Sequence, residues 1–159
     1  MSDTKPTVDI NASASMAGMT MLICDFKRKF NQRIATIPDF PPDDEMATFV
    51  SFVKDEYEEL MSAVDKRDLA NILEEICDLV YVTVGLGVML GLPMNTAFGA
   101  IHAANMAKVG PDGQPVFRED GKVLKPEGWV KPDMQHILDM YSKVAKAFHE
   151  KFHAHKLRI

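Results

Sequence analysis

The segment that most constrains the fold is an apolar run at residues 79–92, near the middle of the 159-residue chain. The run is 14 residues long, includes Thr83, Gly85 and Gly87, and directly follows an acidic segment. A membrane-spanning helix needs about 20 apolar residues, so we interpret the run as a helix that is buried on all sides in a core or a subunit interface. Because 159 residues provide few neighbouring helices, the sequence predicts an all-α bundle of four or five helices that is completed by oligomerisation.

Further helices are predicted where apolar residues recur every three or four positions. This spacing predicts helices over about 13–34, 43–64, 69–90, 93–109 and 133–154. Turn signals at Asp112 with Gly113, and at Asp120 with Gly121, predict a small inserted β-hairpin or ordered loop at about 110–131. Residues 1–12 are expected to form a flexible arm, and residues 13–159 a single helical domain.

Charge is distributed unevenly along the chain. Residues 39–78 hold 13 acidic and 3 basic side chains, a net charge of −10, whereas the remaining residues carry a net charge of +5. A general nucleic-acid-binding protein needs a basic face, so this distribution argues against nucleic acid as a partner. The acidic segment is either a solvated helix face or a site that holds cations.

The cysteines and the N-terminal residues bear on the cellular compartment. Cys24 and Cys77 are isolated and lack the spacing of a disulfide framework or a zinc site, so we interpret them as free thiols in a reducing cytosol. Residues 1–10 have no apolar stretch of the kind found in a signal peptide. The sequence therefore predicts a cytoplasmic protein with no membrane partner.

Two pairs of carboxylates lie within the acidic segment. Glu56 and Glu59 are three residues apart on one predicted helix, and Glu75 and Asp78 are three apart on the next. Each pair shares a helix face beside residues of the predicted core. If the two helices pack antiparallel, the four carboxylates converge, and without a counterion some of them would have to take up protons. A hard cation such as Mg²⁺, which prefers oxygen ligands, would neutralise them.

Two other interpretations of these acids compete with a metal site. Like-charged pairs on an exposed helix face cost only about 0.2–0.5 kcal/mol, so a solvated acidic face explains the residue pattern about as well. A di-iron bundle would require Glu-x-x-His on two helices, and neither acidic pair contains a histidine.

A further polar group lies at the end of the predicted fourth helix. His102, Asn105 and Lys108 are spaced by three and share a face. Beside a metal-carboxylate cluster, Lys108 would pair with a phosphate and Asn105 would bind a sugar hydroxyl or a phosphate oxygen. A lysine at this position is also a common partner of the helix dipole. The predicted hairpin adds Arg118, Lys122 and Lys125 close to Trp129 as a basic lid, although exposed charges of this kind often serve only solubility.

Together these residues resemble a known superfamily. Glu56-x-x-Glu59, then 15 residues, then Glu75-x-x-Asp78 is similar to the ExxE…ExxD signature of the all-α nucleoside triphosphate pyrophosphatases, which include MazG, the dimeric dUTPases and the phosphoribosyl-ATP pyrophosphatases. The stretch from His102 to Lys108, with the later Asp-Gly turns, resembles the MazG-like, phosphoribosyl-ATP-pyrophosphohydrolase-like branch. The resemblance covers roughly residues 20–133.

The resemblance implies a MazG-like fold, a reaction and a set of site residues. A metal-activated water would attack the α-phosphorus of a (d)NTP and release the (d)NMP and pyrophosphate. The residues that would hold Mg²⁺, or Mn²⁺ in its place, and act in catalysis are Glu56, Glu59, Glu75 and Asp78. The residues that would bind the substrate are Asn105, Lys108, Lys122 and Lys125. The pattern does not single out the general base among the carboxylates, and Glu59 is one choice.

Several functions within this class stay open at the level of sequence. Besides a general (d)NTP pyrophosphatase acting as a homodimer or homotetramer, they are a dedicated phage-type (d)GTP diphosphatase similar to MazZ, a phosphoribosyl-ATP pyrophosphohydrolase and a dUTPase-like enzyme. The base pocket that decides between them is expected on the first helix, near Phe26, Phe30 and Asn31. The non-enzyme alternative is a helical module whose acidic cluster only binds a metal or a nucleotide.

Overall fold

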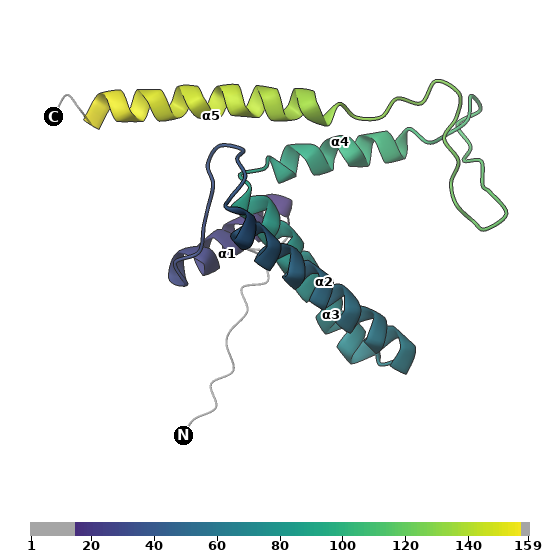
Figure 1. The fold of residues 1–159 in the computed structure, drawn as a ribbon. Coiled ribbons are helices and arrows are strands. Elements are labelled where there is room, and N and C mark those ends of the chain that lie inside the picture. Colours follow the sequence, from purple (N-terminus) through teal and green to yellow (C-terminus); the bar gives the residue numbers. More distant parts are fainter. Residues whose placement is uncertain (1–14, 157–159) are drawn as a thin grey trace.

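The computed structural model describes residues 15–156 of the chain, with side chains to residue 151. Within this range the chain forms five α-helices and no strand longer than an isolated bridge (Figure 1). The helices are α1 (Met16–Lys29), α2 (Asp43–Lys66), α3 (Leu69–Met89), α4 (Met94–Met106) and α5 (Met134–Lys156). The predicted all-α fold is confirmed, whereas the arm predicted at residues 1–12 lies outside the described residues.

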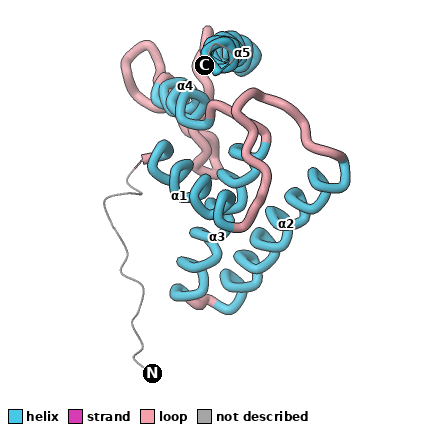
Figure 2. Tube along the Cα trace, turned by 90° about the vertical axis from the view of Figure 1, so that its left-hand side faces the viewer, coloured by secondary structure: helices cyan, strands magenta, loops and turns pink. Residues whose placement is uncertain are grey.

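A tight turn makes α2 and α3 neighbours that run in opposite directions (Figure 2). α2 ends at Lys66, and the next residue, Arg67, adopts the left-handed conformation with φ 56°. Asp68 then caps α3, because its carboxylate accepts hydrogen bonds from the backbone amides of Ala70 and Asn71 at 3.1 and 3.2 Å. A turn this short places residues in the middle of α2 opposite the first turns of α3.

The core of the bundle lies between α1 and α3. Ile23 of α1 and Val84 and Val88 of α3 are buried together, and the less buried side chains of Met16, Cys24 and Ile34 pack against them. The segment after α1 is fastened to the end of α3 by backbone hydrogen bonds from the amide of residue 35 to the carbonyl of residue 88 (3.2 Å) and from residue 39 to residue 90 (3.1 Å). These contacts fix α1 relative to the α2–α3 hairpin.

Two glycines of the apolar run permit a sharp corner between α3 and α4. Gly91 has φ +68°, and a Cβ atom there would lie 2.7 Å from the carbonyl oxygen of Ile37. A Cβ atom on Gly87 would lie 2.7 Å from Cγ of Met94, the first residue of α4. The chain therefore bends by 119° between the two helices.

No single helix within residues 15–156 is long and apolar enough to cross a membrane. α3 and α4 taken together pass by length and composition, but only as the bent pair described above.

α4, the loop after it and α5 form an arm beyond the three-helix bundle (Figures 1 and 2). α4 packs on α1, and α5 runs alongside α4. Thr36 Oγ1 and His149 Nε2, 2.7 Å apart, link α5 to the segment between α1 and α2. In the loop a single antiparallel bridge joins Phe117 and Val123, so the predicted hairpin is present only as this bridge.

The first half of α3 exposes apolar side chains. The sequence predicts burial on all sides for residues 79–92. In the single chain Val84, Val88 and Met89 are buried, whereas Val80 is 40% exposed and Tyr81 is 37% exposed, so the prediction holds only for the second part of the run. Earlier in the helix, one face is open to solvent in the single chain, with Leu69 81% exposed and Leu73 65% exposed. The residues of this exposed stripe, spaced by four, three and four, are Leu69, Leu73, Ile76 and Val80.

Candidate functional site

Three of the four predicted metal-binding carboxylates meet between α2 and α3. Glu56 projects from α2, and Glu75 and Asp78 project from the first turns of α3. One carboxylate oxygen from each residue lies within 4.8 Å of one from the other two. Glu59 lies outside this group of three and is exposed, but its carboxyl group is close enough to Glu75 to share a hydrogen bond. The antiparallel hairpin thus brings the two acidic motifs together.

The electrostatics of the group favour a bound cation. Glu75 is only 8% exposed. Burial, and then the charges of Glu59, Glu74 and Asp78, raise the pKa of its carboxyl group. Burial, followed by repulsion from Asp78, Glu59 and Glu75, also raises the pKa of Glu56.

The donor set fits a hard divalent metal. Each of the three residues contributes a carboxylate oxygen, which is the ligand type that Mg²⁺ and Mn²⁺ prefer. A divalent cation at this position would reverse the repulsion that raises the two pKa values. The group also has an exposed member, Asp78, which leaves a side open for water and phosphate.

Of the predicted substrate-binding residues, Lys108 and Lys125 lie near Trp129, beyond the end of α4. Lys125 Nζ lies 4.4 Å from the ring centroid of Trp129, and Lys108 Nζ lies 5.8 Å from the same centroid. Trp129 is anchored because its Nε1–H donates a hydrogen bond of 2.7 Å to the carbonyl oxygen of Ala104. Asn105, on the last turn of α4, is exposed.

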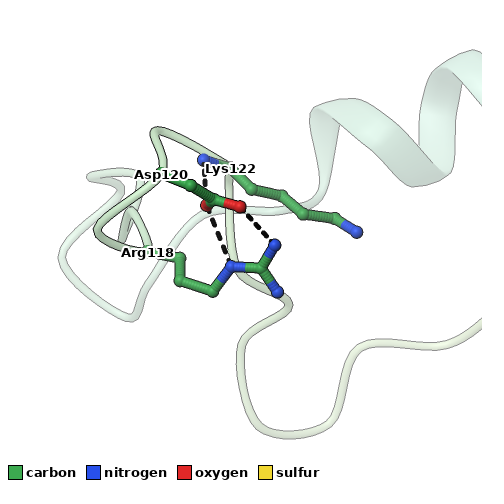
Figure 3. Close-up of polar contacts among 3 residues, drawn as sticks. All are labelled: Arg118, Asp120 and Lys122. Atoms are coloured by element: carbon green, nitrogen blue, oxygen red, sulfur yellow. Dashed lines mark hydrogen bonds and ion pairs between the residues drawn. The ribbon is translucent and has the colours of Figure 1, made fainter.

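The loop that carries the remaining predicted lysine is held by one carboxylate. Asp120 accepts hydrogen bonds from the guanidinium group of Arg118 and from the backbone amide of Lys122 (Figure 3). These bonds lower the pKa of Asp120. The ammonium group of Lys122 extends away from Asp120 (Figure 3). Within one chain, this loop and the end of α4 project to one side of the bundle, away from the α2–α3 hairpin (Figure 1).

A cavity of about 260 Å³ lies between α1, α2 and α3, next to the carboxylates. Of the residues expected near a base pocket, Phe26 lines this cavity, while Phe30 only stacks on Phe26 with ring centroids 4.5 Å apart and Asn31 is exposed. The complete lining is Ile23, Phe26, Lys27, Gln32, Phe49, Phe52, Glu56, Tyr81, Val82 and Gly85.

Sequence reasoning missed the polar residues of this cavity. Lys27 is 1% exposed although it belongs to a charged residue type. It lies one helical turn after Ile23, on the apolar face of α1, and a lysine at such a position is the signal that could have identified it. Gln32 and the α2 aromatics Phe49 and Phe52 carry no comparable signal, because only tertiary contacts such as that of Phe49 with Lys27 bring them to the cavity.

Comparison with known proteins decides the family. A model of the family described as phosphoribosyl-ATP pyrophosphohydrolase matches residues 23–105, more than half of the chain. The chain belongs to this family. The matched segment includes both acidic motifs and most of α1 to α4. Membership in the phosphoribosyl-ATP pyrophosphohydrolase family makes the chain a nucleotide pyrophosphohydrolase.

Other comparisons add less. A crystal structure of a protein from Exiguobacterium sp. 255-15, to which NTP pyrophosphohydrolase activity has been ascribed, is 24% identical. The match covers 92% of this chain and 89% of that chain, with a TM-score of 0.43. A TM-score of this size adds nothing to the family assignment. No curated protein matches the chain.

Proposed function

We propose that the protein is a Mg²⁺-dependent nucleoside triphosphate pyrophosphatase that converts a (d)NTP to the (d)NMP and pyrophosphate. The observation that carries this proposal is the group of Glu56, Glu75 and Asp78, whose carboxylate oxygens lie within 4.8 Å of one another inside the matched family segment. When bound, the metal would lower the pKa of a water molecule and offset charge on the phosphates. Mn²⁺ has the same preference for oxygen ligands and would substitute.

The chain's own carboxylates have distinct tasks in this proposal. Glu75, the most buried of them, would hold the cation in a fixed position, with Glu56 and Asp78 completing the oxygen ligands. Glu59 is exposed and lies against Glu75. From there it would orient the attacking water and accept its proton, as a general base must lie within hydrogen-bond reach of the proton that it removes.

The positions of the predicted substrate-binding lysines bear on whether the active site is formed by one chain or by several. Lys108, Lys122 and Lys125 belong to the segment between α4 and α5. This segment projects away from the α2–α3 hairpin, which carries the carboxylates (Figure 1). We infer that a homodimer or homotetramer completes the site, with the end of α4 from one protomer reaching the carboxylates of its partner. The exposed stripe on α3, Leu69, Leu73, Ile76 and Val80, supports this inference because its spacing is that of a helix–helix interface.

A nucleotide panel tests the reaction. Purified protein is incubated with each of the eight common (d)NTPs and with phosphoribosyl-ATP, and pyrophosphate is measured with Mg²⁺, with Mn²⁺ and with EDTA. We expect pyrophosphate release from at least one (d)NTP with either metal and none with EDTA. Release from phosphoribosyl-ATP alone would replace the proposal with the reaction in the family's name. No release from any substrate would favour the alternative of a module that only binds metal or nucleotide.

A further inference from the structure

The cavity beside the carboxylates has the form of a site for one flat ring. Its volume of about 260 Å³ is enough for a single nucleobase, and four aromatic side chains line it. Phe26 and Tyr81 meet edge to face with ring centroids 5.7 Å apart, and Phe49 and Phe52 do so at 5.5 Å. Aromatic walls of this kind stack on the faces of bases of any sequence, so they provide affinity without choosing between bases.

The cavity also has one polar wall, formed by Lys27 and Gln32. Lys27 Nζ donates a hydrogen bond of 3.4 Å to Gln32 Oε1 and lies 4.0 Å from the ring centroid of Phe49. Among residues 15–151, no carboxylate lies within ion-pair distance of Lys27. Burial lowers its pKa, although Glu45 and Cys24 act in the opposite direction. A lysine kept in this position without an ion-pair partner costs stability, which favours a role in binding.

Glu56 connects this cavity to the carboxylate group. It lines the cavity and is also one of the three residues whose oxygens meet between α2 and α3. A nucleotide with its base in the cavity therefore has its phosphates on the side of Glu75 and Asp78.

We propose that this cavity binds the nucleobase and that Lys27, with Gln32, selects bases that carry an oxo group where adenine and cytosine carry an amino group. The proposal rests on the proposed function, in which the substrate is a nucleotide. It assigns guanine at its O6 edge, and uracil or thymine at O4, as the favoured class.

The selection follows from the hydrogen-bonding capacity of the two side chains. A lysine ammonium group has three donors and no acceptor. The acceptor of the Gln32 amide already faces Lys27, so its NH₂ group is the remaining end, which is also a donor. A wall that presents only donors pairs with the oxo group of guanine or uracil. An amino group at the same place would leave donors on both sides without acceptors, which is the arrangement that polar sites reject most strongly.

The test compares Lys27→Met with Lys29→Met as a matched control. Met keeps the length of the side chain and removes the donors, and Lys29 lies on the same helix, is exposed, and is outside the cavity. Two quantities are measured for each protein: kcat/KM for dGTP, dATP, dUTP and dCTP with Mg²⁺, and binding of GMP, AMP, UMP and CMP by calorimetry in EDTA. We expect the unmodified protein and K29M to prefer oxo bases by about tenfold or more, and K27M to lose that preference in both measurements.

The outcomes separate this proposal from the proposed function. If no nucleotide is hydrolysed but oxo-base monophosphates bind preferentially and K27M abolishes the preference, the base site stands and the reaction does not. If hydrolysis occurs but K27M keeps the base profile of the unmodified protein, the reaction stands and this proposal is overturned. A preference for amino bases, or none, in the unmodified protein overturns it as well.

A second variant keeps the proposal testable if K27M does not fold. Gly85 lines the cavity, and a Cβ atom there would lie 3.9 Å from Lys27 Cε and from Ile23 Cγ2, in ordinary contact. Gly85→Ala should therefore fold, and the added methyl group should raise KM for dGTP by about tenfold without lowering Tm. Gly99→Ala, on α4 with no atom within 4 Å of the new Cβ, is the control for helix propensity and should leave KM unchanged. An unchanged KM in G85A overturns the assignment of the cavity.

Discussion

The α2–α3 hairpin and the arm formed by α4, its following loop and α5 hold their charged residues in different ways. In the hairpin, a short turn and continuous helix packing place Glu56 opposite Glu75 and Asp78 within one chain. In the arm, Lys108 and Lys125 are positioned by local contacts around Trp129, and Lys122 by a loop centred on Asp120. The chain alone therefore brings the carboxylates together, whereas in our proposal the lysines reach the carboxylates only in an assembly of chains.

The largest effect is expected from removing a charge inside the hairpin. Glu75→Gln takes a buried oxygen ligand from the carboxylate group and should lower kcat by at least about 100-fold, since even outer groups of metal sites contribute 10- to 100-fold. Glu58→Gln is the matched control, because Glu58 is an exposed acid on α2 that forms an ion pair with Lys54 at 3.4 Å. Pyrophosphate release is measured for both. Near-normal turnover in E75Q would remove this residue from the active site.

The next largest effect is expected from a substitution in the arm. It tests whether Lys108 serves the carboxylates of its own chain or those of a partner chain. Lys108→Met should lower kcat/KM by about 10- to 100-fold if the lysine pairs with a phosphate. When E75Q and K108M chains are co-expressed with different tags, mixed dimers contain one site with both residues intact. Statistical mixing then restores about a quarter of the normal activity, because half of the dimers are mixed and each has one intact site.

The control for this experiment lies on the exposed stripe of α3. Leu73→Asp, introduced into both chains, places a charge on an apolar residue that is 65% exposed in the single chain. It should prevent the recovery and shift the protein to the monomer mass in sedimentation. Absence of recovery in mixed dimers without this substitution would show that Lys108 acts, if at all, on its own chain.

The hairpin could be predicted from the sequence largely because its determinants are local. The helical period, the cap at Asp68 and the three-residue spacing of the acids all lie within one stretch of chain, so antiparallel packing of two predicted helices was enough to foresee the meeting of Glu56 with Glu75 and Asp78. The arm could not be predicted in this way. Its direction depends on the contacts of Gly87 with Met94 and of Gly91 with Ile37, which no periodicity encodes.

The lining of the cavity also depends on contacts between distant segments, which the sequence pattern does not encode. The sequence indicated the first helix, near Phe26, Phe30 and Asn31, for the base pocket, and of these three residues only Phe26 lines the cavity. Which face of α1 meets α2 is set by packing across the bundle, and that packing buries Lys27 beside Phe49.

A smaller effect is expected in the pH dependence of stability without metal. The raised pKa values of Glu56 and Glu75 mean that the folded protein binds protons more readily than the unfolded chain. The resulting stabilisation is fully present below the ordinary carboxyl pKa of 4.5 and is lost as pH rises through the raised values. In EDTA, Tm should therefore rise by a few degrees as pH falls from neutral toward that ordinary value.

Added Mg²⁺ and the variants E75Q and E58Q provide the controls for this pH dependence of Tm. Saturating Mg²⁺ should raise Tm at neutral pH and flatten its pH dependence, because a ligand that binds only the folded state stabilises it. E75Q should flatten the dependence in EDTA, whereas E58Q should retain it. The lowered pKa of Asp120 acts in the opposite direction but only at more acidic pH, below its ordinary value of 3.8. A Tm that is independent of pH in EDTA would contradict a crowded, charge-repelling group.

The smallest expected effect concerns the internal anchor of the arm. Trp129→Phe keeps an aromatic ring near Lys108 and Lys125 but removes the Nε1–H that donates to the carbonyl oxygen of Ala104 at 2.7 Å. Loss of one hydrogen bond costs about 1 kcal/mol, and it should loosen the loop without moving the α2–α3 hairpin. Hydrogen exchange should therefore increase at residues 107–131 and stay unchanged at the amides of α2 and α3. If protection fell equally in both regions, the arm and the hairpin would form a single cooperative unit, and the contrast between them would not hold.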